Sequence, residues 1–274
     1  MICPDCKSEE ILKSSDGIFC KKCGLELEEG TFISGKGRGN DREIASLPQI
    51  EFMIDPKIEL FSLKLCLKNN KLAPDAIFNL GLDIKEYDSS KKEAVKSAID
   101  AMFKKNAAVL LSSKERLEKN WRTIERRYFY EMEKMFNLEW NSLNYKCYLS
   151  IVCSGGFHNS TNDQIIIQHR WGKASNYVIA HEMFHILFRN YINRFFKEKY
   201  DEFDEELSES LVNIVLLIKL KSVFSNYEFS LDAYSAKHRE MAEQILKLGT
   251  EKSMKEIVIV SYSLFGKQKT WISY

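Results

Sequence analysis

Two histidines and a glutamate lie close together in the sequence, at the spacing of a metal site. His181 and His185 are four residues apart, and Glu182 follows the first of them directly. On a helix, residues four apart lie on one face, so both imidazoles can bind one zinc ion while Glu182 lies beside it. Zinc lowers the pKa of a bound water, and Glu182 could accept its proton. The pattern predicts a zinc hydrolase; the alternative is a buried helix whose histidines are satisfied by hydrogen bonds.

The residues around this motif favour a buried helix. From Val178 to Phe188 the sequence has no proline, no glycine and no charge outside the motif, so nothing there breaks a helix. Ser175 or Asn176 could cap its start. Upstream, residues 145–153 and 164–170 are rich in β-branched and aromatic side chains, which predicts two strands.

Two strands followed directly by such a helix resemble the core of the zincin metallopeptidases, over roughly residues 140–220. The resemblance implies peptide hydrolysis, with Glu182 passing the proton to the leaving amine. It also implies an edge strand that holds an extended peptide substrate above the metal by strand addition.

A catalytic zinc needs a third protein ligand. No HxxGxxH continuation follows His185, so a downstream carboxylate is expected. Glu209 lies deepest in the next apolar helix, where an unpaired carboxylate would be costly. Its surroundings resemble the third-ligand helix of the thermolysin-like gluzincins, with Asn213 in place of the acid that bonds a ligand histidine. Glu205, one turn earlier, is the alternative ligand.

Peptide hydrolysis also needs a donor for the oxyanion that develops in the reaction. Tyr234 and His238, four residues apart and downstream of Glu209, are candidates. Ordinary surface positions explain these two residues equally well. His158 and His169 are weaker candidates.

A second set of metal ligands lies at the start of the chain. Cys3 and Cys6 form one CxxC pair, and Cys20 and Cys23 form another. Four thiolates arranged in this way can bind one structural zinc, which would hold together a segment too short for a hydrophobic core. Two disulfides are the alternative, but the sequence does not begin with the signal peptide that secretion would need.

This segment resembles the N-terminal zinc ribbon of the transcription initiation factor B (TFIIB) family. The resemblance implies docking on RNA polymerase or a transcription factor. Residues 1–30 hold four lysines but seven acidic residues, which favours a protein partner over DNA. The residues that carry the resemblance are Cys3-Pro4-Asp5-Cys6, Asp16-Gly17-Ile18-Phe19-Cys20 and Cys23-Gly24-Leu25-Glu26-Leu27-Glu28-Glu29.

Composition and charge argue against some classes of function, namely nucleic-acid binding and membrane binding. The chain has 274 residues, of which 45% are hydrophobic and 29% charged, enough for one main domain and a small module. A net charge of +1 gives no global attraction to nucleic acid or to an anionic membrane. No apolar run is long enough to cross a bilayer, so we expect a soluble cytoplasmic protein without direct DNA or membrane binding.

We predict an α+β protein in four parts. These are a zinc ribbon at residues 1–30, a flexible glycine-rich linker at 31–50, a helical region at 51–138 and a zincin-like metallopeptidase core at 139–274. In the helical region, apolar periodicity predicts helices at residues 90–103 and 113–136.

The leading functional hypothesis is an intracellular zinc metallopeptidase that binds two zinc ions per chain, one structural and one catalytic, and acts on a transcription-associated protein. The alternative is a non-catalytic transcription regulator, in which the ribbon binds RNA polymerase and the zincin-like body is a scaffold. Glu182 favours the peptidase, because a structural zinc helix would need only the histidines.

Zinc counting tests both predicted sites. The zinc-loaded protein should contain two zinc ions per chain, because the two sites use separate ligands. Substituting His181 with Ala, or Cys3 and Cys6 with Ser, should in each case reduce the count to one, as measured by elemental analysis of the purified protein. A single zinc ion that is lost with the cysteines would contradict the hydrolase prediction.

Overall fold

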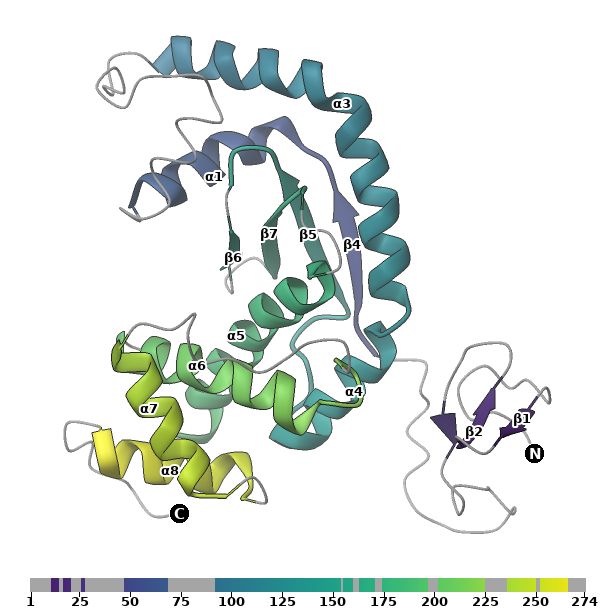
Figure 1. The fold of residues 1–274 in the computed structure, drawn as a ribbon. Coiled ribbons are helices and arrows are strands. Elements are labelled where there is room, and N and C mark those ends of the chain that lie inside the picture. Colours follow the sequence, from purple (N-terminus) through teal and green to yellow (C-terminus); the bar gives the residue numbers. More distant parts are fainter. Residues whose placement is uncertain are drawn as a thin grey trace. The chain divides into compact units, whose positions relative to one another are not determined.

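A computed structural model gives the fold of the chain in two compact units, Met1–Ser46 and Leu47–Tyr274, which are described separately (Figure 1). The structure describes residues 11–14, 17–20, 26–27, 47–68, 92–153, 155–159, 163–170, 174–196, 202–224, 236–249 and 252–265.

The first unit contains a small antiparallel sheet. Its strands are β1 (Ile11–Ser14), β2 (Gly17–Cys20) and β3 (Glu26–Leu27), in the order β1-β2-β3. Cys20 is the last residue of β2, and Cys3, Cys6 and Cys23 lie outside the described residues. The structural zinc site therefore stays a prediction.

The second unit is a mixed α+β fold around one sheet. The strands are β4 (Gln49–Met53), β5 (Asn144–Ser150), β7 (Gln164–Gln168) and β6 (Gly156–Asn159), in that spatial order. The first three run parallel, and β6 pairs antiparallel with β7 at the edge of the sheet. Two of these strands, β5 and β7, are the pair that the sequence predicted.

The two faces of the sheet are covered by different helices. On β5 and β7, Leu149 and Ile167 belong to the main core, which includes much of α5 (Ser175–Phe195). Their neighbours Tyr148 and Ile166 point to the other face, where α1 (Pro56–Lys68) packs. This alternation follows from the two-residue repeat of a strand. α1 begins well because Pro56 suits the first helical position and the Asp55 carboxylate accepts a hydrogen bond from the Lys57 amide, at 2.9 Å.

The helices predicted at residues 90–103 and 113–136 are divided differently in the structure. One long helix, α3 (Lys92–Arg122), joins most of the first predicted helix to the beginning of the second. A shorter helix, α4 (Glu125–Phe136), follows after a turn and contains the rest of the second. At the turn, Thr123 Oγ1 donates a hydrogen bond to the Asn120 carbonyl oxygen, at 2.6 Å, which helps to end α3.

Strand β4 was not predicted: it covers the last two residues of the linker expected at 31–50 and the first three of the helical region expected at 51–138. The Ile50 amide donates to Glu125 Oε1 at 2.8 Å, and the Ile50 carbonyl oxygen accepts from Arg122 Nη2 at 2.9 Å. These side chains occupy the main-chain groups that an edge strand leaves unpaired. The break between α3 and α4 thus brings two charged residues to the edge of the sheet.

The remaining helices pack beside the core. α6 (Glu202–Ile214) packs against α5 and continues as a π-helical segment, η4 (Val215–Lys219), and α7 (Ala236–Lys247) and α8 (Met254–Phe265) follow (Figure 1). Among the described residues, no helix is both long and apolar enough to span a membrane.

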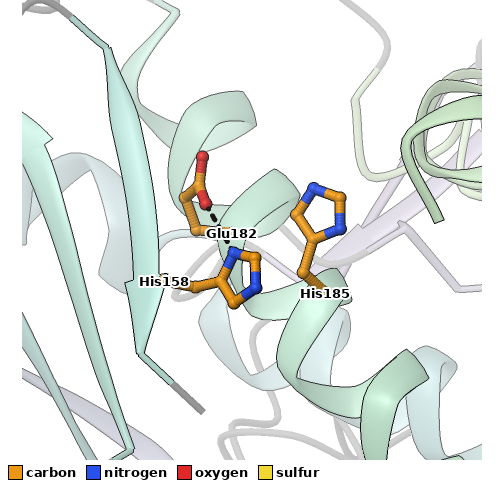
Figure 2. A group of neighbouring side chains, drawn as sticks. All are labelled: His158, Glu182 and His185. Carbon is orange, nitrogen blue, oxygen red and sulfur yellow. Dashed lines mark hydrogen bonds and ion pairs between the residues drawn. The ribbon is translucent and has the colours of Figure 1, made fainter. Parts of the chain in front are cut away.

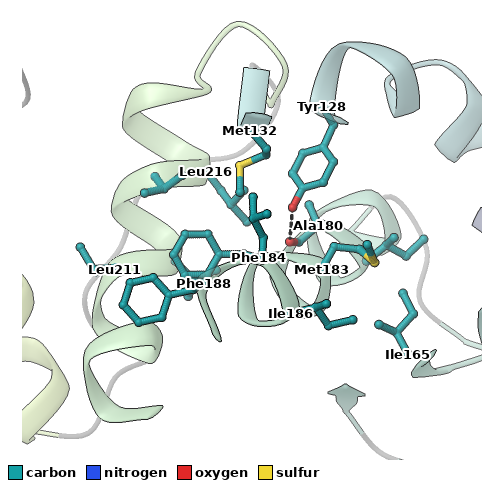
Figure 3. Close-up of a cluster of buried hydrophobic side chains, with 14 of the residues drawn as sticks. Tyr128, Met132, Ile165, Ala180, Met183, Phe184, Ile186, Phe188, Leu211 and Leu216 are labelled. Carbon is teal, nitrogen blue, oxygen red and sulfur yellow. Dashed lines mark hydrogen bonds between the residues drawn. The ribbon is translucent and has the colours of Figure 1, made fainter. Parts of the chain in front are cut away.

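The buried side of α5 packs among aromatic and aliphatic side chains. Phe184 and Phe188 stack with ring centroids 5.7 Å apart and face Leu211 and Leu216 (Figure 3). The Tyr128 hydroxyl donates to the Ala180 carbonyl oxygen at 2.8 Å. This packing fixes the rotation of α5 and therefore the direction of its polar side.

The predicted cap of α5 is wrong. The helix begins at Ser175, its cap residue is Ala174, and no side chain caps it. The Asn176 side-chain amide instead donates to the Asn120 carbonyl oxygen at the end of α3, at 3.1 Å. The start of α5 is thus held by tertiary contact, which a local pattern does not reveal.

A buried carboxylate holds the chain where it leaves β5 toward the site. Glu59, on α1, is 1% exposed and accepts hydrogen bonds from Ser150 Oγ at 2.7 Å and from the amides of Ile151 at 2.9 Å and Val152 at 3.3 Å. Burial raises the pKa of Glu59, and these hydrogen bonds oppose that shift. The carboxylate therefore acts as a cap for the end of β5.

Replacing Glu59 with Ala should destabilise the protein, because three buried donors would lose their acceptor. We expect the free energy of unfolding, measured by urea denaturation, to fall by about 2–4 kcal/mol. The control is Glu243→Ala on the exposed side of α7, which should change it by less than about 0.5 kcal/mol. Equal effects of the two substitutions would argue against the capping role.

Candidate metal centre

Three side chains from two helices converge on one point. α5 supplies His181 and His185, one turn apart, and α6 supplies Glu209. One Glu209 oxygen lies 3.6 Å from His181 Nε2 and the other 3.2 Å from His185 Nε2. The three donor atoms lie within 4.8 Å of one another. Two imidazoles and a carboxylate are the ligand set of many catalytic zinc sites.

The surroundings of His185 fit a metal ligand. Its Nδ1 lies 2.6 Å from the Ser208 hydroxyl, whereas its Nε2 is buried and makes no hydrogen bond, despite the nearby Glu209 oxygen. When Nδ1 carries the proton and donates it to Ser208, Nε2 presents a lone pair toward the carboxylate. A cation between these two atoms would satisfy both.

Charge in the cluster also favours cation binding. Burial raises the pKa of Glu209, but contact with His181 and His185 outweighs this and holds that pKa well below its usual range. Burial lowers the pKa of His185, and the charge of His181 lowers it further against the contact with Glu209. Glu209 is therefore ionised and His185 neutral near pH 7, which are the forms that bind metal. Burial lowers the pKa of His181, but contact with Glu209 and the charges of the nearby carboxylates raise it more, so a cation that binds here must displace a proton from His181.

Glu182 occupies the other side of the same helix turn, beside the edge strand. Its carboxylate is buried, and Oε2 lies 3.2 Å from Nδ1 of His158 on β6 (Figure 2). Burial raises the pKa of Glu182, but the contact with His158 and the charge of His181 lower it more, so the net shift is downward. An ionised carboxylate is the state in which a general base accepts a proton.

A second group of possible ligands shares His185 with the first. His158, Glu182 and His185 also lie within 4.8 Å of one another. Because Nδ1 of His185 is held by Ser208, only its Nε2 can bind an ion. The two groups thus cannot each hold an ion through His185 at the same time. The group with Glu209 contains both histidines of the sequence motif, one turn apart on α5, which is the ligand spacing that the motif predicts.

The structure places the residues that the sequence left open as alternatives. In the part of the chain that it describes, the carboxylate that meets both motif histidines is Glu209, while the charge of Glu205 acts from a greater distance and helps to raise the pKa of His181 and of His158. The hydroxyl of Ser208, rather than Asn213, meets the second nitrogen of His185. Ser208 directly precedes Glu209, but nothing in the sequence pattern assigned it a role.

The other candidate residues are placed as follows. His169 lies just after β7, where its Nδ1 is 3.1 Å from the Ser150 carbonyl oxygen, a structural contact. His238 is on α7, and Tyr234 lies outside the described residues. His158, which the sequence ranked low, contacts both Glu182 and the ring of His185.

The geometry thus combines three side chains that could hold a cation with a buried carboxylate next to them. No protein-family model, curated protein or solved structure matches the chain. The functional argument therefore depends on the residues of the site and their contacts.

Removing the Ser208 hydroxyl should weaken zinc binding at this site. Ser208→Ala leaves Nδ1 of His185 without its partner, so we expect zinc affinity, measured by competition with a chromogenic chelator, to fall about 10- to 100-fold. Ser210→Ala is the matched control, because the Ser210 hydroxyl donates to the Glu206 carbonyl oxygen of its own helix. An affinity equal in both variants would exclude Ser208 as a partner of the metal ligand.

Proposed function

We propose that this chain is a zinc-dependent peptidase whose catalytic site is formed by α5 and α6. The observation that carries the proposal is the position of Glu209. Its two carboxylate oxygens each lie near one histidine of the motif formed by His181, Glu182 and His185, called the HExxH motif below. His181, His185 and Glu209 would hold the zinc ion, and Glu182 would be the general base.

The chemistry divides between the ion and the protein. When bound, zinc would supply the Lewis acidity that makes a water molecule nucleophilic near neutral pH. Glu182, ionised and next to His181 in the helix, accepts the proton of the attacking water. It then returns this proton to the amine that leaves when the peptide bond breaks.

The sheet supports a peptide as the substrate. β6 is the edge strand of the order β4-β5-β7-β6, and His158 on this strand contacts Glu182. An extended peptide can add to an edge strand through main-chain hydrogen bonds. Such a peptide would lie with its carbonyl groups beside the proposed base.

The N-terminal unit would bind the partner protein. We propose that its TFIIB-like ribbon, with zinc held by Cys3, Cys6, Cys20 and Cys23, docks on RNA polymerase or a transcription factor and brings a transcription-associated substrate to the site. The scaffold alternative keeps this docking but has no use for an ionised Glu182 beside the metal ligands.

Glu182→Gln tests the catalytic proposal. The zinc-loaded protein should cleave a mixed peptide library, with products identified by mass spectrometry, and the variant should lose at least about 100-fold in rate because Gln cannot accept a proton. Its zinc content should equal that of the wild type. Glu209→Gln should instead lose the zinc of this site, and Glu243→Gln should change neither property.

Two results would contradict the proposal. One is cleavage by Glu182→Gln at the wild-type rate. The other is a wild-type protein that holds zinc through His181, His185 and Glu209 but cleaves no peptide, which would favour the scaffold alternative.

A further inference from the structure

We infer that the edge strand β6 positions the carboxylate of Glu182, with His158 holding one oxygen and Gly156 leaving space for the other. The inference depends on the proposed function, since it assigns a positioning role around the proposed general base. It adds two residues from outside the HExxH helix to the machinery of the site.

The register of β6 places these two residues together. Gly156 and His158 are two residues apart, so they lie on the same face of the strand. Phe157 between them points the other way and packs with Tyr148 and Ile166. Strand pairing opposes Gly156 to Ile167 and His158 to Ile165, which ties the face that meets Glu182 to the centre of the sheet.

His158 makes a directed contact with a largely buried Glu182. Its Nδ1 lies 3.2 Å from Glu182 Oε2, and the side chains are only 15% and 8% exposed. The ring also stacks on that of His185, with centroids 4.8 Å apart and planes 21° apart. The stacking sets the plane of the imidazole, and the hydrogen bond sets the rotation of the carboxylate (Figure 2).

Position 156 needs glycine because the Glu182 carboxylate lies close to its backbone. A Cβ atom at this position would lie 2.4 Å from Glu182 Oε1 and 2.9 Å from its Cδ, much shorter than contact distance. Any side chain here would push the carboxylate out of its place, because the backbone of a paired strand cannot withdraw easily. The strand therefore meets both oxygens of Glu182.

A fixed general base has a catalytic advantage. A free glutamate side chain samples several rotamers, and few of them bring the carboxylate to the reacting water. His158 and Gly156 hold Glu182 in one rotamer before the substrate binds. The conformational entropy of this side chain is therefore not lost during the reaction itself. A misplacement of about 1 Å can lower a rate by about 100-fold, which sets the scale of the expected effect.

Two substitutions of His158 separate the hydrogen bond from the ring stack. His158→Phe keeps a ring against His185 but removes Nδ1, and His158→Asn loses the ring but keeps an amide nitrogen near the position of Nδ1. If the hydrogen bond positions Glu182, His158→Phe should lower kcat about 10- to 100-fold with KM within about twofold, and His158→Asn should recover most of that loss. The zinc content of both variants should match that of the wild type.

The opposite results would overturn the inference. A wild-type kcat in His158→Phe would exclude the positioning role. Loss of zinc in both variants would instead make His158 a metal ligand, in the group with Glu182 and His185. Gly156→Ala adds an independent check: it should lower kcat while zinc content and the thermal midpoint stay close to those of the wild type.

A spectroscopic readout tests the contact even if no peptide is cleaved. In zinc-loaded protein with ¹⁵N-labelled histidine, the Nδ1 resonance of His158, assigned by its loss in His158→Phe, should shift when Glu182 is replaced by Gln. No shift would refute the contact. An inactive wild type with a shifting resonance would refute the proposed function alone, so the two failures are distinguishable.

Discussion

The structure depends on one constraint: two titratable side chains, Glu182 and His185, are buried on the polar side of α5, and each needs a partner inside the protein. An isolated buried charge costs several kcal/mol. Glu209 therefore lies against His181 and His185, and Glu182 against His158. These partners come from α6 and β6. The contacts that the side chains of α5 need therefore fix the positions of this helix and this strand, which lie on either side of α5.

Buried carboxylates also meet the sheet at two other points, on the neighbouring strands β4 and β5. Glu125 caps the outer edge of β4 at Ile50, and Glu59 caps the main chain where it leaves β5. In both cases a carboxyl group from a helix accepts hydrogen bonds from backbone amides that no neighbouring strand reaches. The cap at Glu59 holds the start of the short segment that leads to β6, so it also fixes the strand that meets Glu182.

The sequence predicted the parts of the site that depend on local spacing. His181, Glu182 and His185 share one helical turn, so a helical repeat suffices to group them. Glu209 is on another helix, and it was predicted because it is an acid in an apolar segment and because a catalytic zinc needs a third ligand. His158 lies 24 residues from Glu182 and meets it only after β6 pairs with β7. Strand β4 and the break between α3 and α4 also depend on contacts more than 70 residues apart. No local pattern encodes such contacts.

The hydrogen bonds at His185 bear on the choice between a metal ligand and an ordinary buried histidine. An ordinary buried histidine has both ring nitrogens satisfied, but here Ser208 meets Nδ1 while Nε2 has no hydrogen bond. A second proton on the ring could pair with Glu209, yet burial lowers the pKa of His185 and opposes it. A divalent cation would need no proton on Nε2. It would bind the lone pair of Nε2 and, at the same time, neutralise the charge of the Glu209 carboxylate. The arrangement therefore supports the proposed metal site over a proton shared between His185 and Glu209.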